Sequence, residues 1–186
     1  MLPMEVYYRL RNKKIVIYDI DNTIIDVRER YNRSLEEAGL DPNTNIRIIP
    51  PHQRNRFWRV FLSSKYIDLD KPDLEEIERL NSMYEMGYGI VLITGRPNYM
   101  RRDTEKQLSQ FGVKYHALIM RPDNNREPDK IYKLKVIKEM VDLGLEIIEY
   151  HEDDPATIDR VKKEFPWIEV CRHNLMRKKM IFHDED

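Results

Sequence analysis

The sequence predicts an α/β fold in which helices cover both faces of a central parallel sheet. Short apolar runs rich in β-branched residues alternate with stretches of helical periodicity along most of the chain. Such alternation is typical of parallel sheets, because a crossover between parallel strands needs a long connection that is usually helical. The five expected strands are residues 13–19, 89–93, 116–120, 146–150 and 167–171.

Helices are expected between these strands. Residues 72–86 repeat apolar side chains at helical spacing after Pro72, and Gly87 is expected to end this helix. Residues 41–71 are expected to be largely irregular, and the polar C-terminal tail is expected to be loose. The other expected helices are residues 27–38, 99–111, 130–143 and 155–165.

Composition limits the class of protein. A chain of 186 residues can form one domain with a modest insertion. Its net charge of −1 argues against a general nucleic-acid binder, so any affinity for polyanions must come from a local patch. The single cysteine, Cys171, excludes an intrachain disulfide and a cysteine metal cluster. With no secretory signal and no long apolar run, we expect a cytoplasmic protein without a membrane span.

Polar side chains gather where three of the predicted strands end. Asp19 and Asp21 follow the first strand, residues 94–96 end the second, and the acids at 152–154 follow the fourth. Ligands of open α/β sheets bind at the carboxyl ends of the strands. Crowded carboxylates repel one another unless a cation binds, and carboxylate oxygens suit Mg²⁺. One acid could attack phosphorus while the other acts as general acid and base, although a plain turn with an Asp-Asn cap would also explain Asp19 and Asp21 alone.

The ordered motifs resemble those of the haloacid dehalogenase (HAD) superfamily. DIDNT at 19–23 resembles its first motif, DxDxT, and LITGR at 92–96 resembles its second. The lysine-bearing helix at 130–143 and EDD at 152–154 resemble the third and fourth. The resemblance implies a Rossmann-like, three-layer HAD fold with a small helical cap after the first strand. It also implies a Mg²⁺-dependent phosphatase that hydrolyses phosphomonoesters through an aspartyl-phosphate intermediate.

The same resemblance assigns roles to residues near the first two strand ends. Asp19 would be the nucleophile and a metal ligand, and Asp21 would be the general acid and base, with its backbone carbonyl on the metal. Because family dehalogenases lack the second acid, Asp21 favours phosphatase or phosphomutase chemistry. Thr94 would hydrogen-bond the phosphoryl group beside the Gly95 amide, unless it only caps the following turn. Arg96 would bind phosphate or substrate, or form a surface salt bridge.

Two lysines compete for the third motif. Lys133 has the family spacing, DxxxK, from Asp129, and it lies at the edge of the apolar face of its helix. Lys130 lies within that face and remains the alternative. The role would be to neutralise charge on the nucleophile and on phosphate.

The resemblance also implies that Asp153 and Asp154 bind the metal, without deciding which of them touches it. Glu152 is expected to support these ligands or to lie in solvent. Thr23 is expected to hold the turn after the first strand.

Residues 27–71 lie between the first two motifs, where this family inserts a cap, so residues 1–26 and 72–186 are expected to form the core. Basic and aromatic residues interleave over 43–66, and Arg54 and Arg56 are candidate substrate-binding residues. Cations beside aromatic faces suit phosphate and base contacts. The alternative is an ordinary helix with its aromatic residues packed inward and its arginines in water.

Residues 94–133 are similar to the phosphatase domain of polynucleotide kinase 3′-phosphatases, including the MRP…R…D loop before the lysine. The phosphate loop GxxxxGK[ST] of the kinase half does not occur. The expected substrate is a phosphorylated small molecule, a nucleotide or a nucleic-acid 3′-phosphate end, with no membrane and no obligate protein partner. The alternatives are a small-metabolite phosphatase or phosphotransferase, and a non-catalytic binding protein with the HAD fold.

Overall fold

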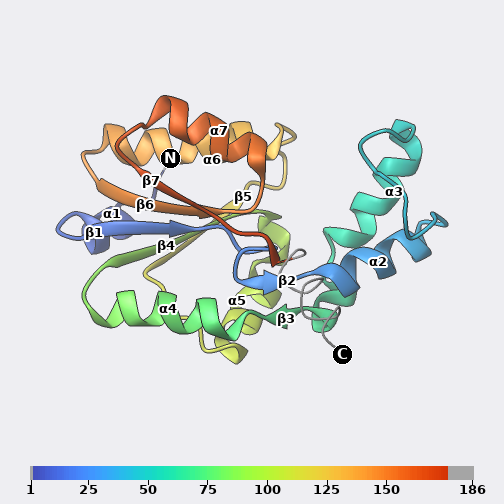
Figure 1. Ribbon diagram of the computed structural model, residues 1–186, viewed down its shortest axis with the longest axis horizontal. Coiled ribbons are helices and arrows are strands. Elements are labelled where there is room, and N and C mark those ends of the chain that lie inside the picture. Colours follow the sequence, from blue (N-terminus) through green and yellow to red (C-terminus); the bar gives the residue numbers. More distant parts are fainter. Residues whose placement is uncertain (1, 176–186) are drawn as a thin grey trace, which may run out of the picture.

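A five-stranded parallel sheet forms the middle layer of the protein (Figure 1). The computed structural model describes residues 2–175. All five predicted strands are present, in the spatial order β5-β4-β1-β6-β7. Most of the tail that was expected to be loose lies outside the described residues. The strands are β1 (Lys14–Tyr18), β4 (Gly89–Pro97), β5 (Ala117–Arg121), β6 (Glu146–Glu152) and β7 (Glu169–Arg172).

Helices cover both faces of the sheet, which confirms the three-layer α/β architecture. On one face lie α6 (Asp129–Asp142) and α7 (Pro155–Glu164), and on the other lie α4 (Leu74–Glu85) and α5 (Arg101–Gln110) (Figure 1). Successive side chains of β1 alternate between two cores, so Ile15 and Ile17 face the first pair of helices and Val16 and Tyr18 the second. A short helix that the sequence did not predict, α1 (Met4–Leu10), adds Leu10 to the first core.

The pairing of the strands brings the polar motifs to one edge of the sheet. β1 lies between β4 and β6, and Tyr18 is level with Leu92 on one side and His151 on the other. Asp19, Thr94 and Glu152 follow these positions by one or two residues. All three therefore lie at the carboxyl edge, where the sequence predicts a site.

Residues 27–71, here called the helical insertion, project beyond this edge (Figure 1). Their elements are α2 (Arg28–Glu37), α3 (Pro51–Phe61) and the 3₁₀ helix η1 (Ser64–Leu69). A two-stranded antiparallel pair, β2 (Ile25–Asp26) and β3 (Lys71–Pro72), joins the insertion to the core. Pro72 therefore belongs to β3 rather than to the first turn of α4, and Asp73 caps α4 by accepting the Glu76 N–H.

Helix α3 occupies part of the stretch that was expected to be irregular. Pro51 suits its first position because the ring fixes φ at a helical value. Phe57 and Phe61, one turn apart, are buried and pack edge-on against Tyr31 of α2. Among residues 2–175, no helix is both long enough and apolar enough to cross a membrane.

Candidate active site

Asp19 directly follows β1, and its side chain is buried. The turn after it folds back, and the Thr23 hydroxyl donates a hydrogen bond to Asp19 Oδ2 at 3.0 Å. Asn22 adopts a φ of 62°, a left-handed conformation that Asn tolerates better than most residues. The turn thus orients one oxygen of Asp19 and leaves Oδ1 for other partners.

Two buried guanidinium groups hold the carboxylate of Asp21. Arg96 donates to Asp21 Oδ1 from Nη2 at 2.6 Å and from Nε at 3.1 Å, and Arg30 donates to the same oxygen at 3.1 Å. The Asp21 side chain keeps 22% of its surface exposed, whereas both arginine side chains are inaccessible. Burial alone would raise the pKa of Asp21, but the two arginines outweigh burial and lower it to about 2. Asp21 is therefore an ionised, oriented group at the rim of a buried network.

Asp70, at the end of the helical insertion, completes this network. Its Oδ1 accepts a hydrogen bond from Arg30 Nε at 3.0 Å, and its Oδ2 accepts one from Gln107 Nε2 at 2.9 Å. Arg96 Nη1 donates to Thr104 at 3.2 Å and to Gln107 at 2.8 Å. The charges of the two acids and the two arginines therefore cancel, and hydrogen bonds join the four side chains. Buried ions are tolerated when they are paired and hydrogen-bonded in this way.

This arrangement differs from the substrate-binding or surface role expected for Arg96. Its Nε, Nη1 and Nη2 atoms are all committed to protein partners, so the side chain positions Asp21 and does not present a nitrogen to substrate. Arg30 and Asp70 were not predicted at all. An arginine on a short helix is normally exposed, so its sequence context gives no sign of complete burial.

Lys133, rather than Lys130, reaches the acidic cluster. Its buried ammonium lies 2.8 Å from Asp19 Oδ1, 2.8 Å from Glu152 Oε2 and 3.2 Å from Asp129 Oδ2. These three acids raise the pKa of Lys133 well above its ordinary value, against the lowering effect of burial. The lysine is therefore a fixed positive charge beside Asp19.

Glu152 is fully buried at the end of β6, not solvated. Its Oε2 accepts hydrogen bonds from Lys133 at 2.8 Å and from the Tyr150 hydroxyl at 2.5 Å. Its Oε1 accepts the backbone N–H groups of Asp153 at 3.0 Å and Asp154 at 3.2 Å. Burial alone would raise the pKa of Glu152, but Lys133 and these hydrogen bonds lower it to about 2. Alternation with the buried Tyr150 was the signal that could have marked Glu152 as an inward residue.

The residues present fit a divalent cation. Asp19, Glu152 and Asp153 offer carboxylate oxygens that lie within 4.8 Å of one another. Burial and the charge of Glu152 raise the pKa of Asp19 well above its ordinary value and that of Asp153 to about 8. Without a cation, Asp19 and Asp153 thus retain protons more readily, and a hard cation such as Mg²⁺ would offset the repulsion among the three acids and favour their ionised forms. Since both oxygens of Glu152 already accept two hydrogen bonds each, Asp19 and Asp153 are better placed to bind the ion.

Asp154 has a different local role from the one expected. It is the N-cap of α7, and its Oδ2 accepts hydrogen bonds from the Thr157 N–H at 2.9 Å and the Thr157 hydroxyl at 2.7 Å. It does not belong to the group of acids around Asp19. The sequence left Asp153 and Asp154 equivalent, because neighbouring acids after a strand can serve either as ligands or as helix caps.

Thr94 is buried at the carboxyl edge of the sheet, and its Oγ1 accepts the Arg96 N–H at 3.1 Å. Thr94 thus caps the backbone that follows it, as one of the two expected roles requires. The hydrogen of its hydroxyl group can still be donated to another group.

Gly95 lies against a carboxylate of α6. A Cβ atom at residue 95 would lie 2.2 Å from Asp129 Oδ1, so a larger residue there would require the Asp129 carboxylate to move. Asp129 in turn pairs with Arg121 at 2.6 Å and with Lys133. The Gly95 backbone therefore packs against Asp129, the first residue of α6.

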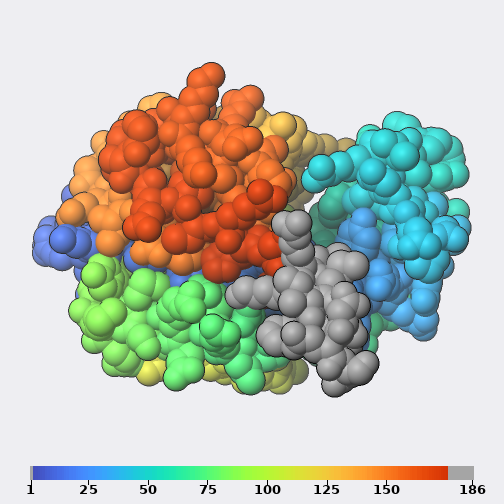
Figure 2. Space-filling view, in the orientation of Figure 1, coloured from blue at the N-terminus to red at the C-terminus, as the bar shows by residue number. Residues whose placement is uncertain are grey.

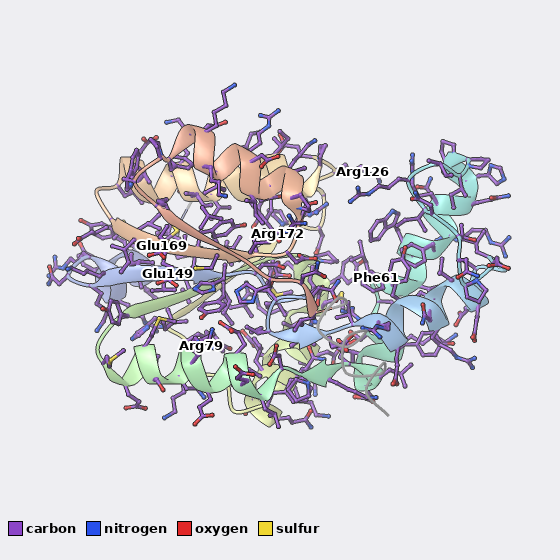
Figure 3. The ribbon with its side chains drawn as sticks, in the orientation of Figure 1. Phe61, Arg79, Arg126, Glu149, Glu169 and Arg172 are labelled. Atoms are coloured by element: carbon purple, nitrogen blue, oxygen red, sulfur yellow. The ribbon has the colours of Figure 1, made fainter. Side chains whose placement is uncertain are left out.

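The helical insertion contacts the core on both sides of this site. The Tyr99 hydroxyl donates to the Leu62 carbonyl at 2.7 Å, and Arg47 lies 3.9 Å from Asp154. Figure 2 shows the surface hollowed between the insertion, in cyan, and the orange part of the core. Arg126, on the loop before α6, points from the core toward α3 (Figure 3).

The two expected substrate-binding arginines, Arg54 and Arg56, both lie on α3. Arg54 is half-buried and Arg56 is exposed, while Phe57 beside them is buried. The inner face of α3 thus packs as an ordinary helix does. Neither Arg54 nor Arg56 takes part in the hydrogen bonds of the buried network around Asp21 that the described residues form.

Solved structures of other proteins share this fold. A chain of the Pnkp1/Rnl/Hen1 complex has a TM-score of 0.64 and 20% identity over 87% of this chain. The match covers 46% of that chain, so the present protein spans less than half of its length. The haloacid dehalogenase-like hydrolase SP0104 from Streptococcus pneumoniae has a TM-score of 0.61 and 13% identity over 88% of this chain and 85% of its own. A predicted phosphatase from Clostridium acetobutylicum has a TM-score of 0.58 and 14% identity over 91% and 99%.

At these identities the likeness to solved structures concerns the fold. No curated protein matches the sequence. A family model described as HAD superfamily, subfamily IIIB (acid phosphatase), matches residues 4–158, most of the chain. The resemblance seen in the four motifs is confirmed: this protein belongs to the HAD superfamily of phosphatases, in subfamily IIIB.

Proposed function

We propose that the protein is a Mg²⁺-dependent phosphomonoesterase that works through an aspartyl-phosphate on Asp19. The observation that carries the proposal is the setting of Asp19. Its Oδ1 lies 2.8 Å from the Lys133 ammonium, and Glu152 and Asp153 lie within the reach of one cation. A nucleophile, a fixed positive charge and a cation-binding cluster thus meet at the carboxyl edge of the sheet.

In the first step, a carboxylate oxygen of Asp19 attacks phosphorus, and the bond from phosphorus to the ester oxygen breaks. Asp21, which takes up a proton from solvent when it loosens from Arg96 and Arg30, gives that proton to the leaving alkoxide. In the second step, Asp21 takes a proton from water as the water oxygen attacks phosphorus, and the bond between Asp19 and phosphorus breaks. Phosphate leaves, Asp19 is again a carboxylate, and Asp21 is again protonated until it returns its proton to solvent and re-forms the ion pair.

Asp21 must change its protonation state during these steps. Its pKa of about 2 in the ion pair keeps it ionised, so it must loosen from Arg96 and Arg30 to carry a proton to the leaving group. Arg30 and Asp70 belong to the insertion, so movement of the insertion would directly change the contact of Arg30 with Asp21 and that of Asp70 with Arg96. This coupling supports residues 27–71 as a cap, with residues 1–26 and 72–186 as the catalytic core.

The other site residues bind and orient. Lys133 would neutralise charge on Asp19 and on the phosphoryl group. Thr94 would donate its hydroxyl hydrogen to a phosphoryl oxygen beside the Gly95 amide, as preorganised donors do in transition states. Asp19 and Asp153 would hold Mg²⁺, with the Asp21 carbonyl as the ligand that the resemblance adds. When bound, the ion would supply positive charge to the phosphoryl oxygens.

We further propose a nucleotide or a nucleic-acid 3′-phosphate end as the substrate. Arg54 and Arg56 on α3, with Arg126 on the facing loop, could contact a polyanion outside the site itself. A chain with a similar fold belongs to a complex described as the Pnkp1/Rnl/Hen1 RNA repair complex, and this description is a reason to test nucleic-acid ends first. The competing substrate class is a small phosphorylated metabolite, which would contact only the site around Asp19 and not the arginines of α3.

The test uses p-nitrophenyl phosphate with Mg²⁺ and with a chelator. We expect hydrolysis that the chelator stops and that Asp19→Asn abolishes, while the exposed control Asp159→Asn keeps it. Activity that persists in Asp19→Asn would refute the nucleophile. Transfer of phosphate to an added acceptor alcohol would indicate a phosphotransferase, and no turnover on any phosphomonoester would indicate a binding protein. Comparison of a 3′-phosphorylated oligonucleotide with sugar phosphates would decide the substrate class.

A further inference from the structure

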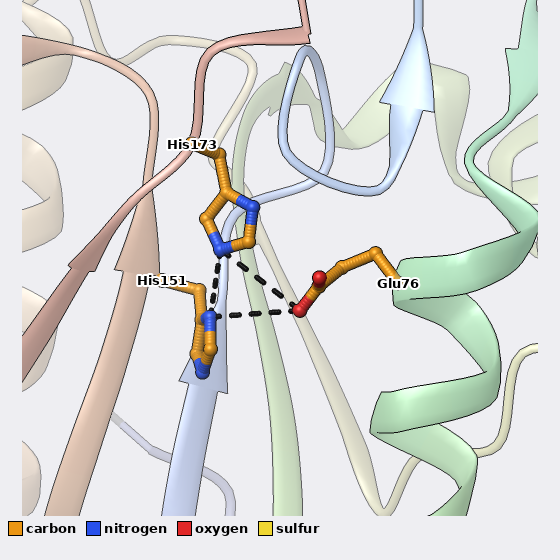
Figure 4. Close-up of side chains that lie close together, drawn as sticks. All are labelled: Glu76, His151 and His173. Carbon is orange, nitrogen blue, oxygen red and sulfur yellow. Dashed lines mark hydrogen bonds and ion pairs between the residues drawn. The ribbon is translucent and has the colours of Figure 1, made fainter. Parts of the chain in front are cut away.

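A second group of metal-ligating side chains lies on the opposite face of the sheet from Lys133. Glu76 of α4, His151 of β6 and His173 just after β7 converge there (Figure 4). All three side chains are buried, with residue exposures of 1%, 3% and 8%. Buried polar side chains need partners, and three of them facing one point mark a built feature rather than chance polarity.

The separations of the ligand atoms suit a metal ion. His151 Nδ1 lies 2.7 Å from His173 Nε2 and 3.8 Å from Glu76 Oε1, and His173 Nε2 lies 4.0 Å from that oxygen. The 2.7 Å contact is a hydrogen bond between the two imidazoles. Tetrahedral Zn²⁺ with bonds of about 2.1 Å places its ligand atoms about 3.4 Å apart, so an ion would take the place of the shared proton and move the two rings apart by less than about 1 Å.

The surrounding groups orient these ligands as metal sites require. His151 Nε2 lies 2.6 Å from Glu149 Oε1, so with the proton on Nε2 the lone pair of Nδ1 faces His173 and can bind an ion in place of the hydrogen bond between the two rings. A carboxylate behind a ligating histidine is a common companion of protein-bound zinc. The Tyr18 hydroxyl donates to Glu76 Oε1 at 3.0 Å, and Arg79 lies 3.4 Å from Glu76 Oε2.

We propose that Glu76, His151 and His173 form a Zn²⁺ site that is separate from the Mg²⁺-type cluster at Asp19. Two imidazoles and one carboxylate suit Zn²⁺, whereas Mg²⁺ prefers oxygen ligands alone. The site ties α4 to β6 and to the segment after β7. Through Tyr18 and His151, it also lies one residue away from Asp19 and Glu152, so its occupancy would stiffen the backbone that carries the catalytic acids.

The direct test is calorimetric titration of Zn²⁺ into the chelator-treated full chain, with excess Mg²⁺ present to fill the acidic cluster. We expect one Zn²⁺ per chain. His173→Gln and Glu76→Gln should each weaken binding by about 100-fold, and Glu149→Gln by about 10-fold, because it orients a ligand without touching the ion. His52→Gln, which removes a histidine from the surface of α3, is the matched control and should leave binding unchanged.

Thermal unfolding gives a second readout that does not depend on activity. Zn²⁺ at about 100 times its dissociation constant should raise the Tm of the wild type by about 5–10 °C and leave that of His173→Gln unchanged. Circular dichroism and Mg²⁺-dependent hydrolysis check that each variant is folded. Binding that survives both His173→Gln and Glu76→Gln in folded protein would overturn the site.

Cys171 decides between two positions of the ion. It lies 3.4 Å from Glu149 Oε1, and with Glu149 and the other nitrogen of His151 it forms an alternative, less buried group. Cys171→Ser should leave Zn²⁺ affinity within about threefold of the wild type, well short of the loss expected when a ligand is removed. Loss of binding in Cys171→Ser, with binding kept in Glu76→Gln, would place the ion on that side and refute the proposal.

Discussion

At the scale of single residues, the site depends on charges that are buried together. Lys133 joins Asp19 and Glu152, and Arg96 and Arg30 join Asp21 to Asp70. Buried ions of this kind add little net stability, but the loss of one partner leaves the other uncompensated. Substitutions here should therefore affect folding as well as turnover, and matched surface variants are needed to separate the two.

Arg96→Gln tests the role of the arginine pair. Removing one guanidinium leaves Asp21 and Asp70 with Arg30 alone, so the free energy of unfolding should fall by about 3–5 kcal/mol. Misplacement of Asp21 should lower kcat on p-nitrophenyl phosphate by about 100-fold at a temperature where the variant is folded. Urea unfolding and steady-state kinetics measure the two effects.

The control for this prediction is Arg33→Gln, which removes an exposed arginine that pairs with Glu36 of α2 and lies over the ring of Tyr66 in η1. It should change neither the urea midpoint nor kcat. A folded Arg96→Gln with wild-type kcat would show that Asp21 does not need Arg96 for its orientation.

Gly95→Ala tests the close contact between β4 and α6. The added Cβ would meet Asp129 Oδ1 at 2.2 Å, so Asp129 must move away from Lys133. We expect a loss of about 1–3 kcal/mol of stability and a clear fall in kcat. The double variant Gly95→Ala with Asp129→Ser should recover part of the stability, because the smaller side chain relieves the overlap.

Gly39→Ala is the matched control for this prediction. Gly39 has a φ of 72° and open space around it, so alanine there strains the backbone without a collision. It should cost stability but leave kcat unchanged. Equal effects of both substitutions on kcat would argue against a role for the contact between Gly95 and Asp129.

At the scale of helices and strands, the sequence predicted most of the core because its signals are local. The central strands β1 and β4 are apolar runs buried on both faces, and Gly or Pro marks many of the element ends. The cap was expected to be helical, but the bounds of α3 were not predicted because Pro50 and Pro51 suggested a loop, whereas Pro51 begins the helix. Helix α1 was missed because it is short and only Leu10 is deeply buried.

The site was less predictable than the fold, for a physical reason. Motif spacing identified Asp19, Thr94 and Lys133 because each lies at a fixed distance from a strand or helix end. Arg30 and Asp70 reach Asp21 only through the tertiary packing of the insertion. The choice between Asp153 and Asp154 depends on which side chain turns to cap α7, and local sequence does not fix that rotation.

Variants of these two neighbours test the assignment at the start of α7. Asp154→Ala removes the N-cap and should lower stability by about 1 kcal/mol, while Asp154→Ser should retain most of it. Neither should change the Mg²⁺ concentration for half-maximal activity, which we expect Asp153→Asn to raise at least about tenfold. If Asp154→Ser raises that concentration as much as Asp153→Asn does, Asp154 is a ligand as well as a cap.

At the scale of the whole molecule, the candidate site residues are divided between the sheet and the helical insertion. The sheet carries Asp19, Thr94 and Glu152, while the insertion adds a buried tie at Arg30, a surface contact at Arg47 and the basic residues of α3. This separation suggests that chemistry resides in the core and that substrate choice resides in the insertion.

The double variant Arg54→Gln with Arg56→Gln tests that division of labour. On a 3′-phosphorylated oligonucleotide, kcat/KM should fall, and the slope of its logarithm against the logarithm of salt concentration should become shallower by about 1.4 for two lost phosphate contacts. Turnover of p-nitrophenyl phosphate should not change.

The matched control is Lys162→Gln with Lys163→Gln, which removes two cations from the last turn of α7, at the other end of the sheet. It should leave both substrates unaffected. An equal loss on both substrates in the Arg54 and Arg56 variant, or no loss on either, would favour a small metabolite over a nucleic-acid end.

The paired strands β2 and β3 have a consequence for how such enzymes could diversify. Because Ile25 and Asp26 lie directly opposite Pro72 and Lys71, the insertion leaves and re-enters the core at one point. A segment of another length could be grafted there without shifting the register of the main sheet. The graft would have to bring its own guanidinium to the position of Arg30 and its own acid to that of Asp70, so inherited variation in substrate range is expected to spare these two residues.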